Sequence, residues 1–584
     1  MPRIPLRILR LTHKAFLGFS VVTAWSYLAS MTGVKCPVLD GGLIMRAVAL
    51  ILGWGGLAEW GIVLAVAILT SSLPRPARLT LAVIVAASSM NLEFAALLLS
   101  TASFTLLILE SLKSIELGIQ AILAGVILAE TLNVAYSLGR VAGVYSPLTL
   151  VGPPLHLSLY CFTTWIAPLI VLAACLSPLI TAGVRLASSP SRRLSSLERI
   201  VLDWRVSITA SMLICLSHWA AMYCSALNPS GRLVGVDPVT RYYPHAIAML
   251  REGPLSFLKV GHDRPLHYLL LLALSYLLGP LKAVKLLPLL CMVLYSMAIF
   301  TLVREFGGLR TAGLAALMAP LSYTTTTGLF GGLYSNWTSL SLATLACATL
   351  VRWFRVGGYR WAATYLLLLV ATAASHIYMG AVAAAALTLT LIVEALKSRK
   401  ALPLLALQLA VITAGLYVAD TVVSMAGGRS PLSIVESNVR GWARSFGRVA
   451  GSGGIFSRKW WNSFSFAVYN YASTSALEPL GWLLTMVGAA SLGLREGSGV
   501  KRVLSILLTS WLAVVTVLAF SAPFNLIYRS LYDFPYTVVE VVGLAYILEV
   551  VEEKYGVETG RLLLAALLMF RLGFATSYVV GLVA

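Results

Sequence analysis

The sequence is poor in charged residues and in glutamine, and it lacks several common catalytic motifs. Asp, Glu, Lys and Arg together make up 11% of the 584 residues, against 59% hydrophobic residues. Glutamine occurs only at Gln120 and Gln408, and a scarcity of thermolabile amides is one mark of proteins from a thermophile. No HExxH metal motif, P-loop or dinucleotide-binding fingerprint occurs, so none of these motifs assigns the chain to an enzyme class.

The seven cysteines form no metal-binding or disulfide pattern. They lie almost entirely inside apolar runs, without a CxxC pair or an interleaved histidine. Cysteine in such surroundings behaves as a small apolar residue, whereas zinc sites and disulfide frameworks show characteristic spacings. We therefore expect buried cysteines, with neither a zinc site nor a disulfide framework.

Long apolar runs indicate an all-α polytopic membrane protein. These runs repeatedly exceed the roughly 20 residues that a helix needs to cross a bilayer. Only helices and closed barrels satisfy their backbone hydrogen bonds in lipid, and the runs are too continuous for the alternating pattern of a barrel strand. We expect a multi-pass protein of the cell membrane, with about sixteen spans in all.

The net charge of +20 comes from Lys and Arg residues in short loops and at the ends of apolar runs. This distribution is typical of topology signals and of contact with anionic membrane lipids. No solvated basic block is present, so the pattern favours membrane lipids as partners and gives no support to nucleic acid.

The sequence predicts two transmembrane modules. Residues 1–185 form an N-terminal bundle of unknown role, which begins with a retained first span rather than a cleaved signal peptide. The Ser- and Arg-rich segment 186–205 is a cytoplasmic linker by the positive-inside rule, and 206–584 is the second module. Between Arg264 and Arg352 the number of predicted spans is inconsistent with the membrane sides that the basic residues indicate. One of these spans is therefore miscounted or re-entrant.

A second polar region, 426–478, is expected at the membrane interface. Ser430 and Pro431 are good start signals for a helix, and the following apolar residues recur at steps of three and four. Arg440, Arg444 and Arg448 fall on another face, so the helix suits the boundary between lipid and headgroups. The alternative is a membrane-surface strut without a binding role.

The longest polar interruption in the first two-thirds of the chain is the loop 228–264 between two predicted spans. It contains VDPVTRYYPHAIAMLREGPLSFLKVGHDRP, and the parity of the preceding spans places it on the extracytoplasmic face. Its order resembles the first outer loop of the GT-C glycosyltransferases, which include protein mannosyltransferases and lipid A aminoarabinose transferases. The matching residues, in chain order, are Asp237, Arg241, Tyr242, Leu250, Gly253, Arg264 and Pro265.

The resemblance implies a GT-C-like helical bundle that uses a sugar linked to polyprenyl or dolichyl phosphate. Asp237 would then be the catalytic base or orient the acceptor, and Arg264 would bind the donor phosphate, because guanidinium meets phosphate bidentately. The further substrate-binding candidates that the resemblance suggests are Arg241, Tyr242, Lys259, His262, Asp263, His376 and Arg529.

Simpler roles stay open for four of these residues. Asp237 precedes Pro238 at the start of a predicted helix, where it could only cap the helix. His376 lies at a turn between two apolar runs and could be a satisfied helix terminus. Lys259 and Asp263 could be solvated loop charges.

The resemblance leaves the wider function class open. Some GT-C enzymes use a divalent metal, but GGLYSNWTS holds no convincing acidic counterpart, so a metal is compatible and no cofactor is assigned. The expected acceptor is a lipid, glycan or protein. The main alternative is a non-enzymatic transporter or flippase of lipid-linked saccharides, although the sequence shows no two similar halves. A structural membrane subunit is a third possibility, favoured only by a disordered loop.

Overall fold

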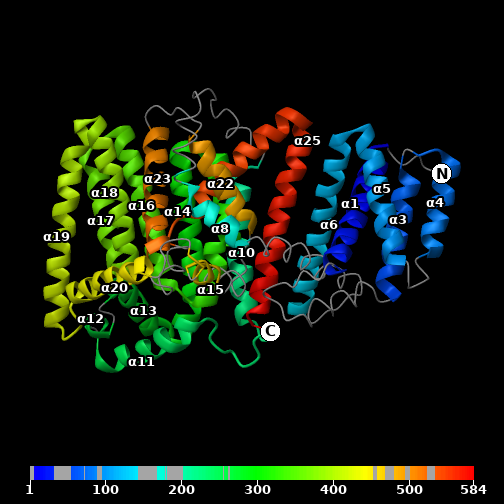
Figure 1. Cartoon of the computed structure of the whole chain (residues 1–584). Coiled ribbons are helices and arrows are strands. Elements are labelled where there is room, and N and C mark those ends of the chain that lie inside the picture. The colour runs from blue at the N-terminus through cyan, green and yellow to red at the C-terminus, as the bar shows by residue number, and fades with distance from the viewer. Residues whose placement is uncertain are drawn as a thin grey trace. The chain divides into compact units, whose positions relative to one another are not determined.

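The described part of the chain is helical in the computed structural model, with no strand among its residues (Figure 1). The structure describes residues 6–31, 54–71, 73–88, 95–142, 167–177, 179, 202–253, 255–260, 263–451, 457–458, 460–466, 479–493, 500–521 and 533–583. Within these residues, six helices are long and apolar enough to cross a membrane. The all-α membrane class is therefore confirmed at this level, whereas the total of about sixteen spans stays a prediction.

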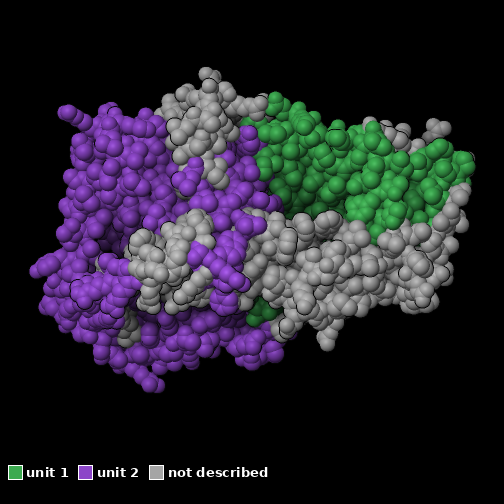
Figure 2. Space-filling view, viewed as in Figure 1, with its two compact units in different colours: residues 1–167, 547–582, 584 green, residues 168–546, 583 purple. Residues whose placement is uncertain are grey.

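The chain divides into two compact units (Figure 2). Unit 1 comprises residues 1–167 and 547–582, and unit 2 comprises essentially 168–546. The division differs from the predicted modules, because the segment 547–582 belongs with the N-terminal helices. The predicted linker 186–205 lies almost entirely outside the described residues.

Unit 1 is built on the crossing of its first and last N-terminal helices. A β-carbon at Gly18 would lie 1.7 Å from the carbonyl oxygen of Ala121, so only glycine lets the two backbones meet. Small residues allow this approach between membrane helices. The helices of this part are α1 (Leu6–Met31), α3 (Trp54–Thr70), α4 (Arg75–Ser88), α5 (Ala95–Lys113) and α6 (Ile115–Ala142).

Side-chain hydrogen bonds explain why the C-terminal segment belongs to unit 1. The long helix α25 (Tyr536–Gly581) is broken at Gly556 (φ 84°), and its second half packs in this unit. Gln120 donates to the hydroxyl of Thr559 over 2.8 Å, and Asn133 donates to the carbonyl of Gly573 over 3.2 Å. Such bonds hold membrane helices together where apolar packing gives no preference.

Unit 2 contains the remaining helices and the candidate site. In chain order they are α8 (Ala167–Cys175), α10 (Trp204–Tyr223), η3 (Pro238–Tyr242), α11 (Tyr243–Glu252), α12 (Ser256–Val260), α13 (Pro265–Leu278), α14 (Pro280–Met318), η4 (Ala319–Leu321), α15 (Tyr323–Gly331), α16 (Tyr334–Val356), α17 (Tyr359–Ser375), α18 (Ile377–Lys397), η5 (Arg399–Ala401), α19 (Leu402–Met425), α20 (Pro431–Gly451), α22 (Pro479–Gly493) and α23 (Val500–Ser521). Figure 1 shows α11, α12, α13 and α20 at the lower end of this unit.

Helix α13 lies in the region where the number of predicted spans was inconsistent with the basic residues, between Arg264 and Arg352. It has 14 residues and starts in the 228–264 loop at Arg264. Just after it, Lys285 packs over the ring of Tyr223 at the loop end of α10, and its ammonium lies near Gly231 of the loop. Both ends of α13 thus lie near the 228–264 loop. The number of crossings between Arg264 and Arg352 stays a prediction.

Buried carboxylates paired with partly exposed arginines mark the opposite end of the unit 2 helices. The carboxylate of Glu305 pairs with Arg352 and Arg355 at 3.1 and 2.9 Å, and Glu394 pairs with Arg502 at 3.0 Å. Breaking a buried pair strands a charge, so these contacts fix the helix ends against one another. From Ser375, α17 and α18 therefore run away from the loop side as a hairpin.

The predicted helix at 430–450 is present as α20. The hydroxyl of Ser430 accepts a hydrogen bond from the backbone N–H of Ser433 over 3.1 Å, which confirms the N-cap. Asp420 of α19 adds a second acceptor for the N–H of Leu432 at 3.0 Å. Arg440 and Arg444 are exposed. The orientation of α20 in a membrane stays a prediction.

Candidate functional site

The 228–264 loop folds over the lower end of unit 2 as three short helices, η3, α11 and α12. Pro238 starts η3, and Gly253 ends α11 with φ 98°, a backbone conformation that favours glycine. The rings of Tyr242 and Tyr334 stack with centroids 5.7 Å apart, which anchors the loop to α16. The loop is thus folded where the structure describes it.

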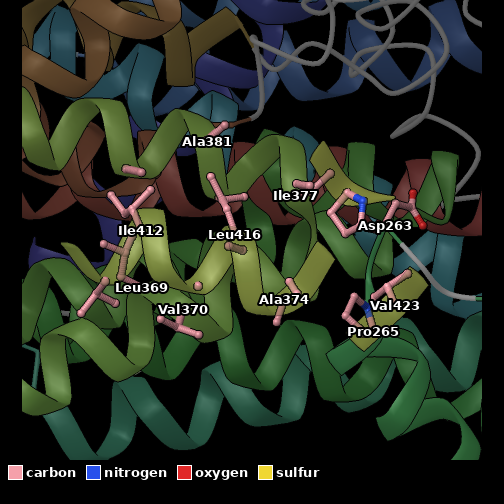
Figure 3. A pocket seen from close by; sticks show the side chains of 17 residues that line it. Asp263, Pro265, Leu369, Val370, Ala374, Ile377, Ala381, Ile412, Leu416 and Val423 are labelled. Atoms are coloured by element: carbon pink, nitrogen blue, oxygen red, sulfur yellow. The ribbon is translucent and has the colours of Figure 1, made fainter. Parts of the chain in front are cut away.

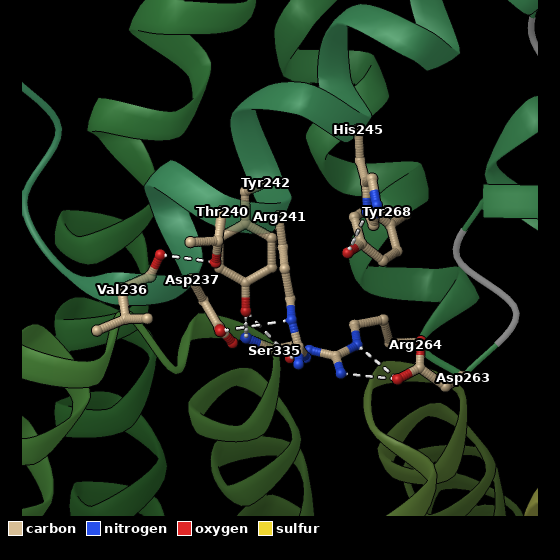
Figure 4. A network of polar contacts seen from close by, with 10 residues as sticks. All are labelled: Val236, Asp237, Thr240, Arg241, Tyr242, His245, Asp263, Arg264, Tyr268 and Ser335. Carbon is tan, nitrogen blue, oxygen red and sulfur yellow. Dashed lines mark hydrogen bonds and ion pairs between the residues drawn. The ribbon is translucent and has the colours of Figure 1, made fainter.

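Arg264 is the buried cation of the site (Figure 4). Only 5% of the residue is exposed. Its Nε and Nη2 both donate to Oδ2 of Asp263, at 3.0 and 2.7 Å, and its Nη1 donates to the hydroxyl of Ser335 at 2.8 Å. Burial alone would lower the pKa of Arg264, but the Asp263 carboxylate raises it above its ordinary value. The guanidinium therefore stays charged.

Ser335 joins Arg264 to Tyr242. The Tyr242 hydroxyl donates to the Ser335 hydroxyl over 3.2 Å, and the Ser335 backbone N–H donates to the Tyr242 oxygen over 3.2 Å. Burial raises the pKa of Tyr242, so its hydroxyl stays protonated and remains a donor. Ser335 lies in the first turn of α16, where a backbone N–H has no partner within the helix. The Tyr242 oxygen therefore provides an acceptor for a backbone N–H at the start of α16.

Asp237 lies beside the same cluster and does not act as a helix cap. Its backbone is helical, and its side chain makes no capping hydrogen bond to η3. The carboxylate instead faces Arg241, with 3.6 Å between Oδ1 and Nε. Figure 4 shows Asp237, Arg241, Ser335 and Arg264 in one row. The capping alternative for Asp237 was wrong, because residue 237 has already adopted the helical backbone.

His376 lies at the start of α18 and caps it. Its Nδ1 accepts from the backbone N–H of Met379 over 3.3 Å, as expected for a helix terminus. The next residue, Ile377, donates its N–H to the carbonyl of Asp263 over 3.2 Å. The turn at His376 therefore packs beside the Asp263–Arg264 pair, although its side chain has a structural task there.

An apolar groove of about 340 Å³ extends from the ion pair along the membrane helices (Figure 3). Asp263 and Pro265 line one end, and Leu369 and Ile412 line the other. Small residues of α17, α18 and α19 leave the space, namely Ala373, Ala374, Gly380, Ala381, Ala384 and Gly415. From Ile412 to Val423 the groove follows about 16 Å of α19, at the helical rise of 1.5 Å per residue. Asp237 is not among its lining residues.

The other candidates from the sequence do not join the cluster where they are described. Lys259 is exposed and pairs with Glu252 at 3.2 Å, as expected for a solvated loop charge. Arg241 is half-exposed beside Asp237. His262 and Arg529 lie outside the described residues. Among the described residues, no group of three His, Cys, Asp or Glu side chains could hold a metal ion.

Two polar residues beside Ser335 were not predicted. Asn336 donates to the carboxylate of Asp533 over 2.8 Å, and Asp533 is fully buried. The indole of Trp511 donates to the backbone carbonyl of Asp533 over 2.9 Å. Asn336 occurs in the stretch GGLYSNWTS, and Asp533 follows the candidate Arg529 by four positions in the sequence, which was the available signal.

Comparisons of the chain with protein-family models, with curated proteins and with solved structures give no match.

Proposed function

We propose that the protein is a membrane glycosyltransferase that moves a sugar from a polyprenyl-phosphate donor to a lipid, glycan or protein acceptor outside the membrane. The observation that carries this proposal is that Tyr242 and Arg264 both bond to Ser335, with Asp237 beside them. These three residues come from the loop that resembles the first outer loop of GT-C enzymes. A carboxylate and a buried guanidinium are the two groups that such a transfer needs.

In the proposed step, the acceptor hydroxyl loses its proton to the Asp237 carboxylate as its oxygen bonds to the anomeric carbon of the sugar. The bond between that carbon and the phosphate oxygen breaks, and the electron pair leaves with the lipid phosphate. The phosphate gains negative charge, which the Arg264 guanidinium stabilises. No metal is required for this proton and charge balance.

The groove supports a lipid-linked donor. It is lined almost entirely by apolar side chains, many of them from α18 and α19, which are long and apolar enough to span a membrane. It ends at Asp263, beside Arg264. An isoprenoid chain would gain apolar contacts along α17, α18 and α19, while its phosphate stays at the polar end. The fully buried pair of Asp533 and Asn336 would orient the first turn of α16, which holds Ser335.

The test is sugar transfer by the purified full-length protein in lipid vesicles, with a radiolabelled polyprenyl-phosphate sugar as donor. A transferase yields labelled acceptor and releases polyprenyl phosphate. Movement of intact donor between leaflets, without product, would instead favour the transporter alternative. If the protein shows no sugar transfer and no movement of the donor, both the transferase proposal and the transporter alternative are contradicted.

A further inference from the structure

Asp263 occupies the part of Arg264 that a phosphate would use. One oxygen of Asp263 accepts hydrogen bonds from both Nε and Nη2 of Arg264. This edge of a guanidinium is one that binds oxyanions with two parallel N–H donors. The Nη1 group of Arg264 donates to the hydroxyl of Ser335, also within the protein. An incoming phosphate therefore meets an arginine that already has an anionic partner.

The same aspartate also lines the groove. Asp263 and the neighbouring Pro265 line one end of the cavity, where the Asp263 carboxylate is the polar group. The backbone carbonyl of Asp263 accepts a hydrogen bond from the N–H of Ile377. The Asp263 side chain is 29% exposed, whereas that of Arg264 is 6% exposed. The carboxylate is therefore the more accessible member of the pair.

We propose that Asp263 is a specificity-determining residue that competes with the substrate phosphate for Arg264, so that only a phosphate with its chain in the groove binds. This inference rests on the proposed lipid-phosphate function of the site. A soluble phosphate ester gains only contacts of its charged group, and it must give up hydration and displace Asp263. An isoprenoid phosphate gains the apolar contacts of the groove in addition. A ligand thus binds only if its own contacts outweigh the interaction between Asp263 and Arg264 that it displaces.

The experiment compares the binding of three probes to the full-length protein in lipid nanodiscs: butyl phosphate, farnesyl phosphate and farnesol. Asp263→Asn keeps a hydrogen-bond acceptor for Arg264 and removes the competing charge. We expect this variant to bind both phosphates about tenfold more tightly, since a charge-assisted bond is replaced by a neutral one. Farnesol, which has no phosphate, should bind both proteins equally.

Three further variants make the test specific to Arg264. Asp263→Glu retains the charge and should bind like the wild type. Glu252→Gln removes another carboxylate of the same loop and should leave phosphate binding unchanged. In an Arg264→Gln background, Asp263→Asn should no longer tighten phosphate binding.

Unchanged or weaker phosphate binding by Asp263→Asn, with farnesol binding retained, would overturn the inference and leave Asp263 as a support for Arg264. An equal gain in the Arg264→Gln background would also overturn it, because the effect would then be a general loss of negative charge. These readouts need no sugar transfer. If the predicted affinity shifts are observed but no sugar is transferred, the transferase proposal is contradicted and the inference about Asp263 is not.

Discussion

At the scale of single residues, Ser335 joins the two sides of the candidate site without any charge of its own. It accepts a hydrogen bond from Arg264 and exchanges two with Tyr242. A serine with buried donors on both sides costs little to desolvate, since its hydroxyl both donates and accepts. Tyr242 and Arg264 are thereby joined through one side chain although 22 positions of sequence separate them.

His376 allows a prediction that separates a cap from a substrate contact. His376→Ala should lower the free energy of unfolding by about 1 kcal/mol, because the first turn of α18 loses its side-chain acceptor. His376→Asn should restore stability, since asparagine is a good N-cap. The measurements are unfolding in mixed micelles and sugar transfer. A stable His376→Asn protein with strongly reduced transfer would show a substrate role instead.

The residues with charge could be predicted from the sequence, and their partners could not. Asp237, Tyr242 and Arg264 all lie in the 228–264 loop, and the order of residues in this loop made them predictable as candidates. Ser335 lies in α16 and Asp533 in the bend before α25, so both are distant in sequence from the loop, and neither carries a motif. For His376 the sequence left a cap and a ligand open, and only the bond to Met379 identified the cap.

At the scale of helices, the groove exists because α17, α18 and α19 contribute small side chains at facing positions. A β-carbon at Gly380 would lie 2.4 Å from the backbone of Ala373, so α17 and α18 are in close contact at the floor. A β-carbon at Gly415 would meet no atom within 4 Å. Gly415 on α19 therefore borders open space, and larger residues there enter the groove without a clash of backbones.

Filling the groove at Gly415 should block the donor chain while the fold persists. Gly415→Leu is expected to raise the donor concentration needed for half-maximal transfer about tenfold or more, because part of the apolar contact surface is lost. Leucine also suits a helix better than glycine, so stability should not fall. Val418→Leu, at a lipid-exposed position of the same helix, is the matched control. If both variants need the same donor concentration for half-maximal transfer, the groove does not bind the donor chain.

Most helices were predictable because their apolar runs are long, and α13 shows where this reasoning stops. The helices α16 to α19, for example, follow apolar runs that have clear polar ends in the sequence. The run 265–280 is equally apolar but has only 14 helical residues, and the chain after it returns to the loop. Hydrophobicity alone does not distinguish a crossing helix from a short buried one.

At the scale of the whole molecule, most of the last helix, from Ile547 onward, belongs to the unit formed by the first helices. The break at Gly556 separates the two halves of α25, and the second half bonds to Gln120 and Asn133 of α6. Pairing between segments more than 400 positions apart leaves no local pattern, so the predicted module 206–584 included 547–582. The role of unit 1 has no assignment from its residues.

The central claim is that the chain transfers sugar with Asp237 as base, and the Asp237→Asn variant tests it most directly. The substitution keeps the size of the side chain and removes the basic carboxylate. Because Asp237 caps no helix and its pair with Arg241 is partly exposed, folding and donor binding should be retained. Glu252→Gln, in the same loop, is the control.

The measurement is the rate of transfer of radiolabelled sugar from a polyprenyl-phosphate donor by the purified protein in lipid. Asp237→Asn should reduce it about 10²–10⁴-fold, the usual cost of losing a general base, while Glu252→Gln keeps the wild-type rate. Transfer by Asp237→Asn at the wild-type rate would contradict the account.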